Sequence, residues 1–306
     1  MPELPEVESV LRSIRPIVLG RTIARVDVLT AGVFLNDHLP AEGWRIAAMS
    51  RRGKYLVLEL DFDVPEKPAR ARLIVHLRMT GQLLLDREEP VPQKHTHVIL
   101  RLDSPKEGEP PIWLEYHDTR RFGRLWLLPA DGRGEPAGLA ALGPEPLEQG
   151  FDLDLFACKL ARRTKSSLKA VLLDQTVLAG LGNIYADEVL FASGLNPART
   201  AGSLNRSEMA RLWEAIVRVL TRAIDCQGTT LRDYVNGWNQ QGTFQNCLMV
   251  YGRAGRPCQI CSTPIQARRL AGRTTCWCPL CQPDELPQAI QVQTTKTARC
   301  RQNGST

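Results

Sequence analysis

The sequence predicts an α+β multidomain protein, in which a β-sandwich or flattened barrel follows a leading helix and precedes a helical domain with a four-cysteine hairpin. Three observations support this fold class. Short β-rich runs separated by Gly, Pro and Asp occupy residues 20–130. Apolar residues at helical spacing occupy residues 151–226. Two Cys-x2-Cys pairs, at 258–261 and 278–281, follow near the C-terminus.

The composition indicates a two-domain protein with a polyanionic partner. The chain has 306 residues, and 39 Lys and Arg against 33 Asp and Glu give a net charge of +6. The acidic N-terminus does not resemble a signal peptide, and no apolar run approaches the ~18 residues of a membrane span. Five of the nine cysteines fall between Cys258 and Cys281, which argues against a secreted disulfide framework. We therefore expect a cytoplasmic, nucleoid-associated protein with no membrane partner.

The leading helix begins with Met-Pro-Glu-Leu-Pro-Glu, which brings an amine and two carboxylates together. Removal of the initiator methionine would leave a free secondary amine at Pro2, followed by Glu3 and Glu6. Pro5 has its φ angle already set for a first helical turn. An apolar stripe behind it predicts a helix docked on a core; its members are Val7, Val10, Leu11 and Ile14. The amine is therefore expected at the mouth of an anchored helix.

An N-terminal amine is suited to nucleophilic chemistry because amines attack in the neutral form. At pH 7 about 14% of an α-amine with a pKa near 7.8 is neutral, against about 0.04% of a lysine. A prolyl amine is more basic, so the site must lower its pKa. A secondary amine also forms a cationic iminium with a sugar carbon, which acts as an electron sink in eliminations. Read alone, the stretch is better explained as a well-capped helix start.

The predicted N-terminal domain covers residues 1–131. Its strands are expected at 55–60, 72–77, 97–102, 112–116 and 124–128, each bounded by turn-forming residues. Residues 132–150 change to Gly, Pro and Glu, which predicts a linker.

The chain then becomes helical, and residues 151–246 form the second predicted domain. Helices are expected at 151–162, 167–179, 184–193 and 207–226. Residues 228–245 are rich in Gly, Asn and Gln, which predicts a mobile loop. Residues 283–306 are polar with few apolar anchors, so we expect a disordered tail.

Residues 247–282 form the third predicted unit, a zinc hairpin. Its four ligands would be Cys258, Cys261, Cys278 and Cys281, because each Cys-x2-Cys pair places two thiolates on one turn. Four thiolates leave no open position, so a single structural zinc ion is expected, with a binding energy on the order of 10 kcal/mol. A redox pair is the alternative. The hairpin also carries Arg268, Arg269 and Arg273, whereas Cys276 lies outside the spacing.

Six motifs occur in order along the chain: PELPE at 2–6, RGKYL at 52–56, HLRMTG at 76–81, DTRRFG at 118–123, GLGNIY at 180–185, and the four-cysteine hairpin. Together they resemble the bacterial formamidopyrimidine-DNA glycosylases, which excise 8-oxoguanine, over residues 1–282. The resemblance implies an N-terminal β-sandwich, a helix–two-turns–helix element in the C-terminal half, and a zinc hairpin.

The resemblance also implies catalytic roles. Pro2 would attack C1′ of the damaged nucleotide and form a Schiff base, and Glu3 would protonate the sugar ring oxygen or the leaving group, with a pKa raised by burial. Glu6 would support the amine electrostatically. Lys54 would lie by the phosphate or deoxyribose and assist β-elimination, and Arg273 would serve δ-elimination and phosphate binding.

DNA-contacting roles follow from the same resemblance. An enzyme that flips a nucleotide out of a duplex must fill the gap, and Met79, Arg120 and Phe122 match the residues that do so. Buried Met and Phe beside a salt-bridged Arg are the alternative. Residues 228–235 resemble the loop that closes over 8-oxoguanine. Thr119 stands where Pro is usual, which predicts a looser loop.

Other DNA contacts are expected at the phosphates. Asn183 would offer its amide and a helix N-terminus to a phosphate. His76 and His95 are further candidates, with a structural histidine as an equal alternative. A basic cluster, alternatively a solvated helix face, comprises Arg162, Arg163, Lys165 and Lys169. Thr164 interrupts this cluster where Lys or Arg is common.

The resemblance thus implies a bifunctional DNA glycosylase and abasic-site lyase. It would remove 8-oxoguanine and formamidopyrimidines from duplex DNA by β,δ-elimination, acting as a monomer with one zinc ion and no redox cofactor. Two alternatives remain open: an oxidised-pyrimidine glycosylase of the endonuclease VIII type, and a non-catalytic zinc-dependent protein that binds lesion DNA. A zinc-ribbon protein of the ribosome, in which the N-terminal amine has no role, is a third.

Overall fold

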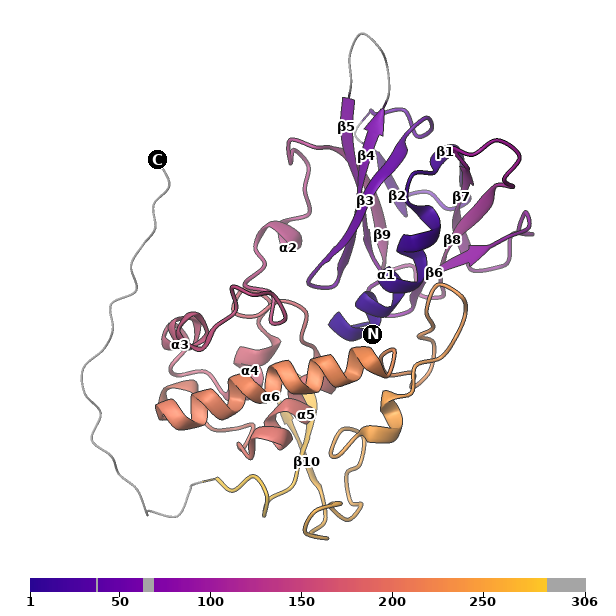
Figure 1. Ribbon diagram of the computed structural model, residues 1–306. Coiled ribbons are helices and arrows are strands. Elements are labelled where there is room, and N and C mark those ends of the chain that lie inside the picture. The colour runs from indigo at the N-terminus through magenta and orange to yellow at the C-terminus, as the bar shows by residue number, and fades with distance from the viewer. Residues whose placement is uncertain (37, 63–68, 285–306) are drawn as a thin grey trace, which may run out of the picture.

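A computed structural model describes residues 1–36, 38–62 and 69–284. Figure 1 shows a sheet domain, a helical domain, and a hairpin beside the helical domain. The helix α1 (Leu4–Val18) lies between the sheet and the long helix α6 (Arg206–Asp225) and contacts both. The predicted tail begins at 283, so all but its first two residues lie outside the described residues.

The helix α1 joins two hydrophobic cores. Its apolar stripe is fully buried against the sheet, as Val7, Val10 and Ile14 show. Leu4, at its first turn, packs instead into the core of the helical domain. The Leu4 N–H donates to the Gly180 carbonyl at 3.0 Å. The N-terminus of the chain is therefore fixed where the two domains meet.

The N-terminal domain is a nine-stranded sheet within the described residues, folded into a sandwich. The strand order is β2-β9-β5-β4-β3-β1-β7-β8-β6. β1 and β3 pair through a single residue pair, Thr22 with Arg45, so the sheet divides there into two layers (Figure 1). Both layers contribute to one core, which confirms the predicted sandwich. The strands are β1 Thr22–Val28, β2 Phe34–Asn36, β3 Arg45–Arg52, β4 Tyr55–Phe62, β5 Ala69–His76, β6 Gly81–Asp86, β7 Thr96–Asp103, β8 Ile112–Asp118 and β9 Arg124–Pro129.

The five expected strands correspond to β4, β5, β7, β8 and β9, and the prediction missed the other four. β3 explains why: its sequence RIAAMSRR buries only two side chains, so it lacks the apolar density of a predicted strand. It forms because it pairs with β4 along its full length. Strand pairing and burial outweigh intrinsic propensity at such positions.

The segment 132–150 contacts both domains. It contains the short helix α2 (Ala137–Ala140), whose Leu139 is buried against a small cluster on the outer face of the sheet. Further along, the Gly143 N–H donates to the Gln175 carbonyl at 2.8 Å, and the Ala179 N–H donates to the Pro144 carbonyl at 3.0 Å. This segment is therefore packed on the sheet and hydrogen-bonded to the helical domain.

The helical domain contains α3 (Leu153–Ala161), α4 (Leu168–Leu173), α5 (Asn183–Ser193) and α6. The predicted helix 167–179 was wrong beyond Leu173. Asp174 ends α4 because its carboxylate accepts the Thr176 N–H at 2.9 Å and starts a turn. The chain makes turns from there to α5. Among the described residues, no helix is long and apolar enough to cross a membrane.

The C-terminal hairpin pairs β10 (Gln266–Leu270) with β11 (Arg273–Trp277). Its small core is built from Val250, Ile265 and cysteine side chains. Three consecutive backbone N–H groups, of residues 249–251, donate to the buried carboxylate of Glu188 in α5. The hairpin is therefore anchored to the helix that begins beside the N-terminus.

Candidate active site

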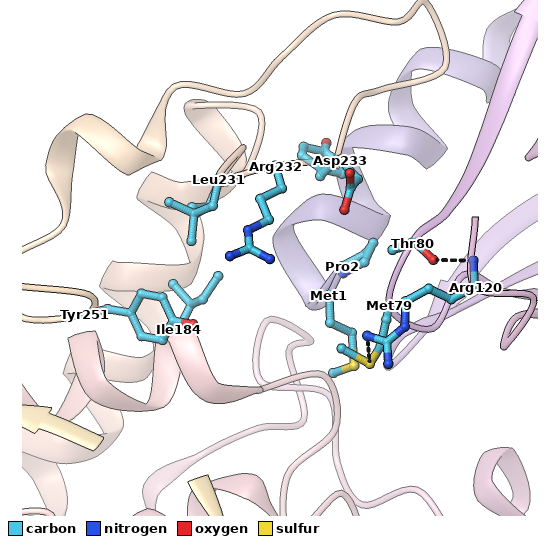
Figure 2. A pocket seen from close by; sticks show the side chains of 12 residues that line it. Met1, Pro2, Met79, Thr80, Arg120, Ile184, Leu231, Arg232, Asp233 and Tyr251 are labelled. Carbon is cyan, nitrogen blue, oxygen red and sulfur yellow. Dashed lines mark hydrogen bonds between the residues drawn. The ribbon is translucent and has the colours of Figure 1, made fainter. Parts of the chain in front are cut away.

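A pocket of about 390 Å³ lies at the N-terminus of the chain. Its walls come from the N-terminus, the loops after β5 and β8, the start of α5, the loop after α6, and the segment before the hairpin. Figure 2 shows Leu231 and Arg232 across the cavity from Met79 and Arg120. The lining residues are Met1, Pro2, Met79, Thr80, Arg120, Ile184, Thr229, Leu231, Arg232, Asp233, Tyr234 and Tyr251.

Pro2 and Glu3 are both buried beside this pocket. The Glu3 carboxylate faces the N-terminus of α5, where it accepts the Gly182 N–H at 2.7 Å and the Ile184 N–H at 3.0 Å. Gly182 is required by this approach, because an added Cβ would come within 2.5 Å of the carboxylate. The helical domain therefore fixes the position of the Glu3 carboxylate.

Glu6 connects the N-terminus to the loop after α6. One of its oxygens accepts the Glu3 N–H at 2.7 Å, and the other accepts the Tyr185 hydroxyl at 2.5 Å and the Thr229 N–H at 2.7 Å. Burial, and next the charge of Glu3, raise the pKa of Glu6 to about 7. Glu6 is therefore poised between its neutral and ionised forms at physiological pH. Sequence patterns gave no sign of its contacts to Tyr185 and Thr229.

Lys54 lies in the same charged group as Glu3, Glu6 and Arg273. Its side chain is buried, and Nζ donates to the Leu181 carbonyl at 2.8 Å. Burial lowers the pKa of Lys54; the charges of Glu3 and Glu6 oppose this shift, and Arg273 adds to it. A larger neutral fraction makes the amine a better proton acceptor. The structure thus brings together residues from three distant parts of the sequence: the two glutamates of the N-terminus, Lys54 and Arg273.

Glu145, in the segment 132–150, holds the turn that carries Lys54. Its carboxylate accepts the Gly53 N–H at 2.5 Å, Arg51 Nη1 at 2.6 Å and Arg52 Nη1 at 2.8 Å. Its side chain is 1% exposed. The sequence analysis did not predict a role for Glu145. The one available signal was an acidic residue between two prolines, in a chain that carries an Arg-Arg pair directly before the Gly-Lys of the predicted site.

An exposed group of three side chains lies at the pocket mouth, and we call it the wedge: Met79, Arg120 and Phe122. Met79 is 41% exposed and Phe122 is 51% exposed, which is inconsistent with the alternative of core side chains. Arg120 lies between them: its Cζ is 4.7 Å from the Phe122 ring centroid, and its Nη1 is 3.2 Å from the Met79 sulfur.

The two candidate histidines differ in their surroundings. His76 is buried, its Nδ1 accepts the Arg78 N–H at 2.9 Å, and its ring packs edge-on against Tyr55. Burial, and next the charge of Arg78, lower its pKa to about 3, so it is neutral at pH 7. These contacts favour the structural alternative for His76. His95 is half-buried, and its buried Nδ1 has no partner among the described residues.

The basic cluster is smaller than predicted. Lys165 is exposed, as are both arginines before it. Lys169 is fully buried. Its Nζ donates to Asp187 Oδ1 at 2.6 Å and to the Asn183 carbonyl at 3.0 Å, and these bonds compensate the burial of its charge. Including Lys169 in a surface that tracks a phosphate backbone was therefore wrong: a buried ammonium is paired. The carboxylate that pairs with Lys169 belongs to Asp187, which lies in none of the six motifs.

The start of α5 is joined to the hairpin. Asn183 is its first residue, and its amide nitrogen donates to the Thr274 carbonyl at 3.1 Å. Asp187 accepts the Cys276 N–H at 3.0 Å. Cys276, left without a role by the sequence, thus contributes its backbone to this joint. Arg273 is exposed at the beginning of β11, next to Thr274.

The four predicted ligand cysteines form one cluster. The Sγ atoms of Cys258, Cys261, Cys278 and Cys281 all lie within 4.8 Å of one another. Three of their separations are 3.4, 3.5 and 3.9 Å. A tetrahedral ion with metal–sulfur bonds of about 2.3 Å requires separations of about 3.8 Å. The cluster therefore fits a tetrahedral metal ion with four thiolates.

Two family models match the chain. The formamidopyrimidine-DNA glycosylase N-terminal domain matches residues 1–125, and the H2TH (helix–two-turns–helix) domain of the same enzymes matches residues 142–235. Together with the four-cysteine hairpin, these matches place the protein in the class of two-domain H2TH DNA glycosylases.

Relatives and solved structures give the same family over nearly the whole chain. The formamidopyrimidine-DNA glycosylases of Desulfitobacterium hafniense and Heliobacterium modesticaldum are 42% and 45% identical, each over 92% of this chain and 100% of the relative. The crystal structure of the MutM (Fpg) protein from Thermus thermophilus superposes with a TM-score of 0.79 at 42% identity, covering 93% and 100%. A Lactococcus lactis Fpg mutant in complex with a Fapy-dG-containing DNA superposes with a TM-score of 0.79 at 36% identity, covering 92% and 100%. The chain therefore belongs to the formamidopyrimidine-DNA glycosylase family, which confirms the predicted family and enzyme class.

Proposed function

We propose that this enzyme is a bifunctional glycosylase and abasic-site lyase, which removes 8-oxoguanine and formamidopyrimidines from duplex DNA. One observation carries the proposal: a pocket with Pro2 in its wall adjoins two buried carboxylates and a buried lysine, and the wedge stands at its mouth. A base needs a cavity, its sugar needs a nucleophile, and the vacated duplex needs a plug.

The proposed reaction begins at the N-terminus. Met1 lines the pocket beside Pro2, so its removal would free the Pro2 nitrogen at the cavity wall (Figure 2). The nitrogen lone pair forms a bond to C1′ as the bond to the base breaks. The departing base and the ring oxygen each take up one proton: Glu3 supplies one, and the Pro2 nitrogen, which loses its hydrogen as the iminium forms, supplies the other. Ring opening then leaves an iminium between Pro2 and C1′.

The iminium makes strand cleavage possible. Loss of a proton from C2′ sends its electron pair toward the iminium and expels the 3′ phosphate, and a second elimination expels the 5′ phosphate. Lys54, with its lowered pKa, is the proposed proton acceptor for the first elimination. Arg273 is proposed to bind a phosphate and to support the second.

The proposed DNA contacts surround the pocket. The wedge enters the duplex, where Met79 and Phe122 stack and Arg120 offers donors to the unpaired cytosine. The N-terminus of α5 at Asn183, the exposed Lys165 and the partly buried His95 are proposed to contact phosphates. The solved L. lactis complex with a Fapy-dG-containing DNA supports lesion-containing DNA as the partner. We further propose that the enzyme acts as a monomer on the nucleoid.

The cysteine cluster is proposed to hold one zinc ion. Zinc accepts four thiolates in tetrahedral geometry and is not redox-active, which suits a structural role. The ion would stabilise a hairpin whose own core contains few residues. In this way it would hold Arg273 near Lys54.

Borohydride trapping tests the proposal. Reduction during turnover of an 8-oxoguanine:C duplex is expected to give a covalent adduct, and peptide mapping is expected to place it on Pro2. An adduct on an interior lysine, or retention of Met1 in the active enzyme, would overturn the mechanism. Absence of any adduct would favour the non-catalytic alternative. Faster cleavage of thymine glycol duplexes would favour the oxidised-pyrimidine alternative.

A further inference from the structure

Asp118, at the end of β8, is the common anchor of the two loops that carry the wedge. Its carboxylate is fully buried. Oδ1 accepts the Thr80 hydroxyl at 2.5 Å, from the loop of Met79, and the Arg120 N–H at 3.1 Å. Oδ2 accepts the Gly123 N–H at 2.8 Å and the Tyr116 hydroxyl at 3.1 Å. One side chain thus bonds the loop before β6 to the loop before β9.

The two loops converge closely on the same point. A Cβ added to Gly81 would lie 2.8 Å from the Tyr116 hydroxyl oxygen, and one added to Gly123 would lie 1.8 Å from it. Each loop therefore carries glycine where it passes the pair formed by Tyr116 and Asp118. The Thr80 hydroxyl also accepts the Arg120 N–H at 3.2 Å, which joins the loops a second time.

Both loops contain a strained residue beside a wedge side chain. Arg78, before Met79, has φ of 55°, and Arg121, between Arg120 and Phe122, has φ of 57°. The left-handed conformation is unfavourable for residues with a Cβ and persists only where surrounding contacts enforce it. The Arg120 and Gly123 N–H groups, on either side of Arg121, donate to the Asp118 carboxylate, and the Arg78 N–H donates to His76 Nδ1.

The ionisation of Asp118 agrees with this role. Burial acts to raise its pKa, but the hydrogen bonds from Thr80, Gly123, Arg120 and Tyr116 outweigh burial and leave the pKa below its usual value. Asp118 is therefore an acceptor for all four donors at neutral pH.

We infer that Asp118 is the positioning residue of the wedge, which sets Met79, Arg120 and Phe122 in their inserting geometry before DNA binds. The inference rests on the proposed function, because it concerns how the duplex is plugged. It predicts that Asp118 matters for lesions inside a duplex far more than for a sugar that is already accessible. The four donors to the Asp118 carboxylate all come from β8 and the two wedge loops, so the chemical steps at Pro2 do not depend on it directly.

The test compares the rates at which the zinc-loaded, full-length enzyme cleaves two DNA substrates. Single-turnover rates are measured on an 8-oxoguanine:C duplex and on a single-stranded oligonucleotide with one abasic site, which has no gap to fill. In Asp118→Asn the new NH2 group faces a donor, so at least one hydrogen bond is lost and the charge is removed. The ratio of the duplex rate to the single-strand rate is expected to fall about tenfold or more.

Asp131→Asn is the matched control. Asp131 lies after β9, at the end remote from the wedge, and caps its loop by accepting the Arg133 N–H at 3.0 Å. Its substitution is expected to leave the ratio within about twofold of the unaltered enzyme. Thr80→Val removes a single donor to Asp118 and keeps the carboxylate. It is expected to lower the ratio less than Asp118→Asn does, and it tests the inference should that variant fail to fold.

A rescue variant separates positioning from general stability. Adding Arg121→Gly to Asp118→Asn removes the left-handed strain and is expected to restore part of the duplex rate. Equal losses on both substrates, or an unchanged ratio in both Asp118→Asn and Thr80→Val, would overturn the inference. If the unaltered enzyme cleaves neither substrate, the proposed function fails instead, and the two failures are thereby distinguished.

Discussion

The properties of single residues in this enzyme depend on contacts made across the domain boundary. Glu3 and Glu6 belong to the leading helix, yet their hydrogen-bond donors include Gly182, Tyr185 and Thr229 from the C-terminal half. Burial between the two domains raises the pKa of Glu6, and the hydrogen bonds from Tyr185 and Thr229 oppose this rise. The sequence predicted two carboxylates beside the amine, but not that the pKa of Glu6 would be raised to about 7.

Replacing Glu3 by Gln is expected to suppress base excision and to leave lesion binding near normal. A general acid contributes roughly 10²–10⁴-fold to rate, so excision should fall at least about 100-fold. Single-turnover excision and equilibrium binding to an 8-oxoguanine duplex measure the two effects. Excision at the rate of the unaltered enzyme would show that another group is the acid.

Replacing Glu6 by Gln is expected to change how stability depends on pH. The folded pKa of Glu6 is raised from 4.5 to about 7, so the folded state holds a proton that the unfolded state loses between these values. The unaltered enzyme therefore loses stability, relative to Glu6→Gln, as the pH rises from 4.5 to 7. The full difference corresponds to roughly 3 kcal/mol.

Urea unfolding at pH 5 and pH 8 provides the measurement for Glu6. The difference between the two unfolding free energies, unaltered enzyme minus Glu6→Gln, should decrease from pH 5 to pH 8. A difference that is constant between these pH values would contradict the raised pKa.

Among the elements, the segment 132–150 shows most clearly how packing adds function to a predicted linker. Its composition predicted a spacer, and Leu139 and Glu145 are nevertheless buried. Glu145 bonds the turn of Lys54, while its neighbours Gly143 and Pro144 bond the loop between α4 and α5. The segment therefore sets the position of Lys54 relative to the helical domain.

Replacing Glu145 by Gln is expected to slow strand cleavage about tenfold, because a charged hydrogen-bond acceptor is lost at the Lys54 turn. If the effect acts through Lys54, the same change in a Lys54→Met background should slow cleavage less than about twofold. Glu135→Gln is the control: Glu135 lies in the same segment and pairs with Arg72 at 3.0 Å, remote from Lys54. Equal losses in both backgrounds would indicate a general effect on folding.

On the scale of the whole molecule, the effect of the excess basic residues on DNA binding depends on which of them are exposed. Lys169 and Arg51 are buried and paired with carboxylates, so they contribute little to an external field. Exposed residues such as Lys165 and Arg273 remain available for phosphates. The net charge of +6 therefore does not measure the DNA-binding surface.

Affinity for duplex DNA is expected to fall steeply with salt. Each phosphate neutralised by Lys or Arg releases a counterion, so log K should decrease linearly with log salt concentration, with a slope of about −0.9 per contact. Fluorescence anisotropy between 50 and 200 mM salt, as approximate limits, measures the slope. Binding that is flat over this range would contradict a basic groove.

Several parts of the fold and site could be predicted because their signals are local. The stripe of α1, the five apolar strands, the long helix α6 and the cysteine spacing each repeat within a short window. β3 and the turns after Leu173 could not be predicted in the same way. β3 depends on its pairing with β4, which its own sequence does not encode. The turn at Asp174 is local, but the apolar residues on both sides of it gave the helical pattern that was predicted.

The sequence by itself determined the N-terminal proline with its two glutamates, the wedge residues, the four thiolates, and through six ordered motifs the family. Only the tertiary structure decided the partners of the buried charges: Glu6 with Tyr185, Lys169 with Asp187, and Asp118 with two loops. The physical reason is that a charged residue looks the same in a sequence whether it is solvated or buried. Its partner lies far along the chain, and folding alone brings the two together.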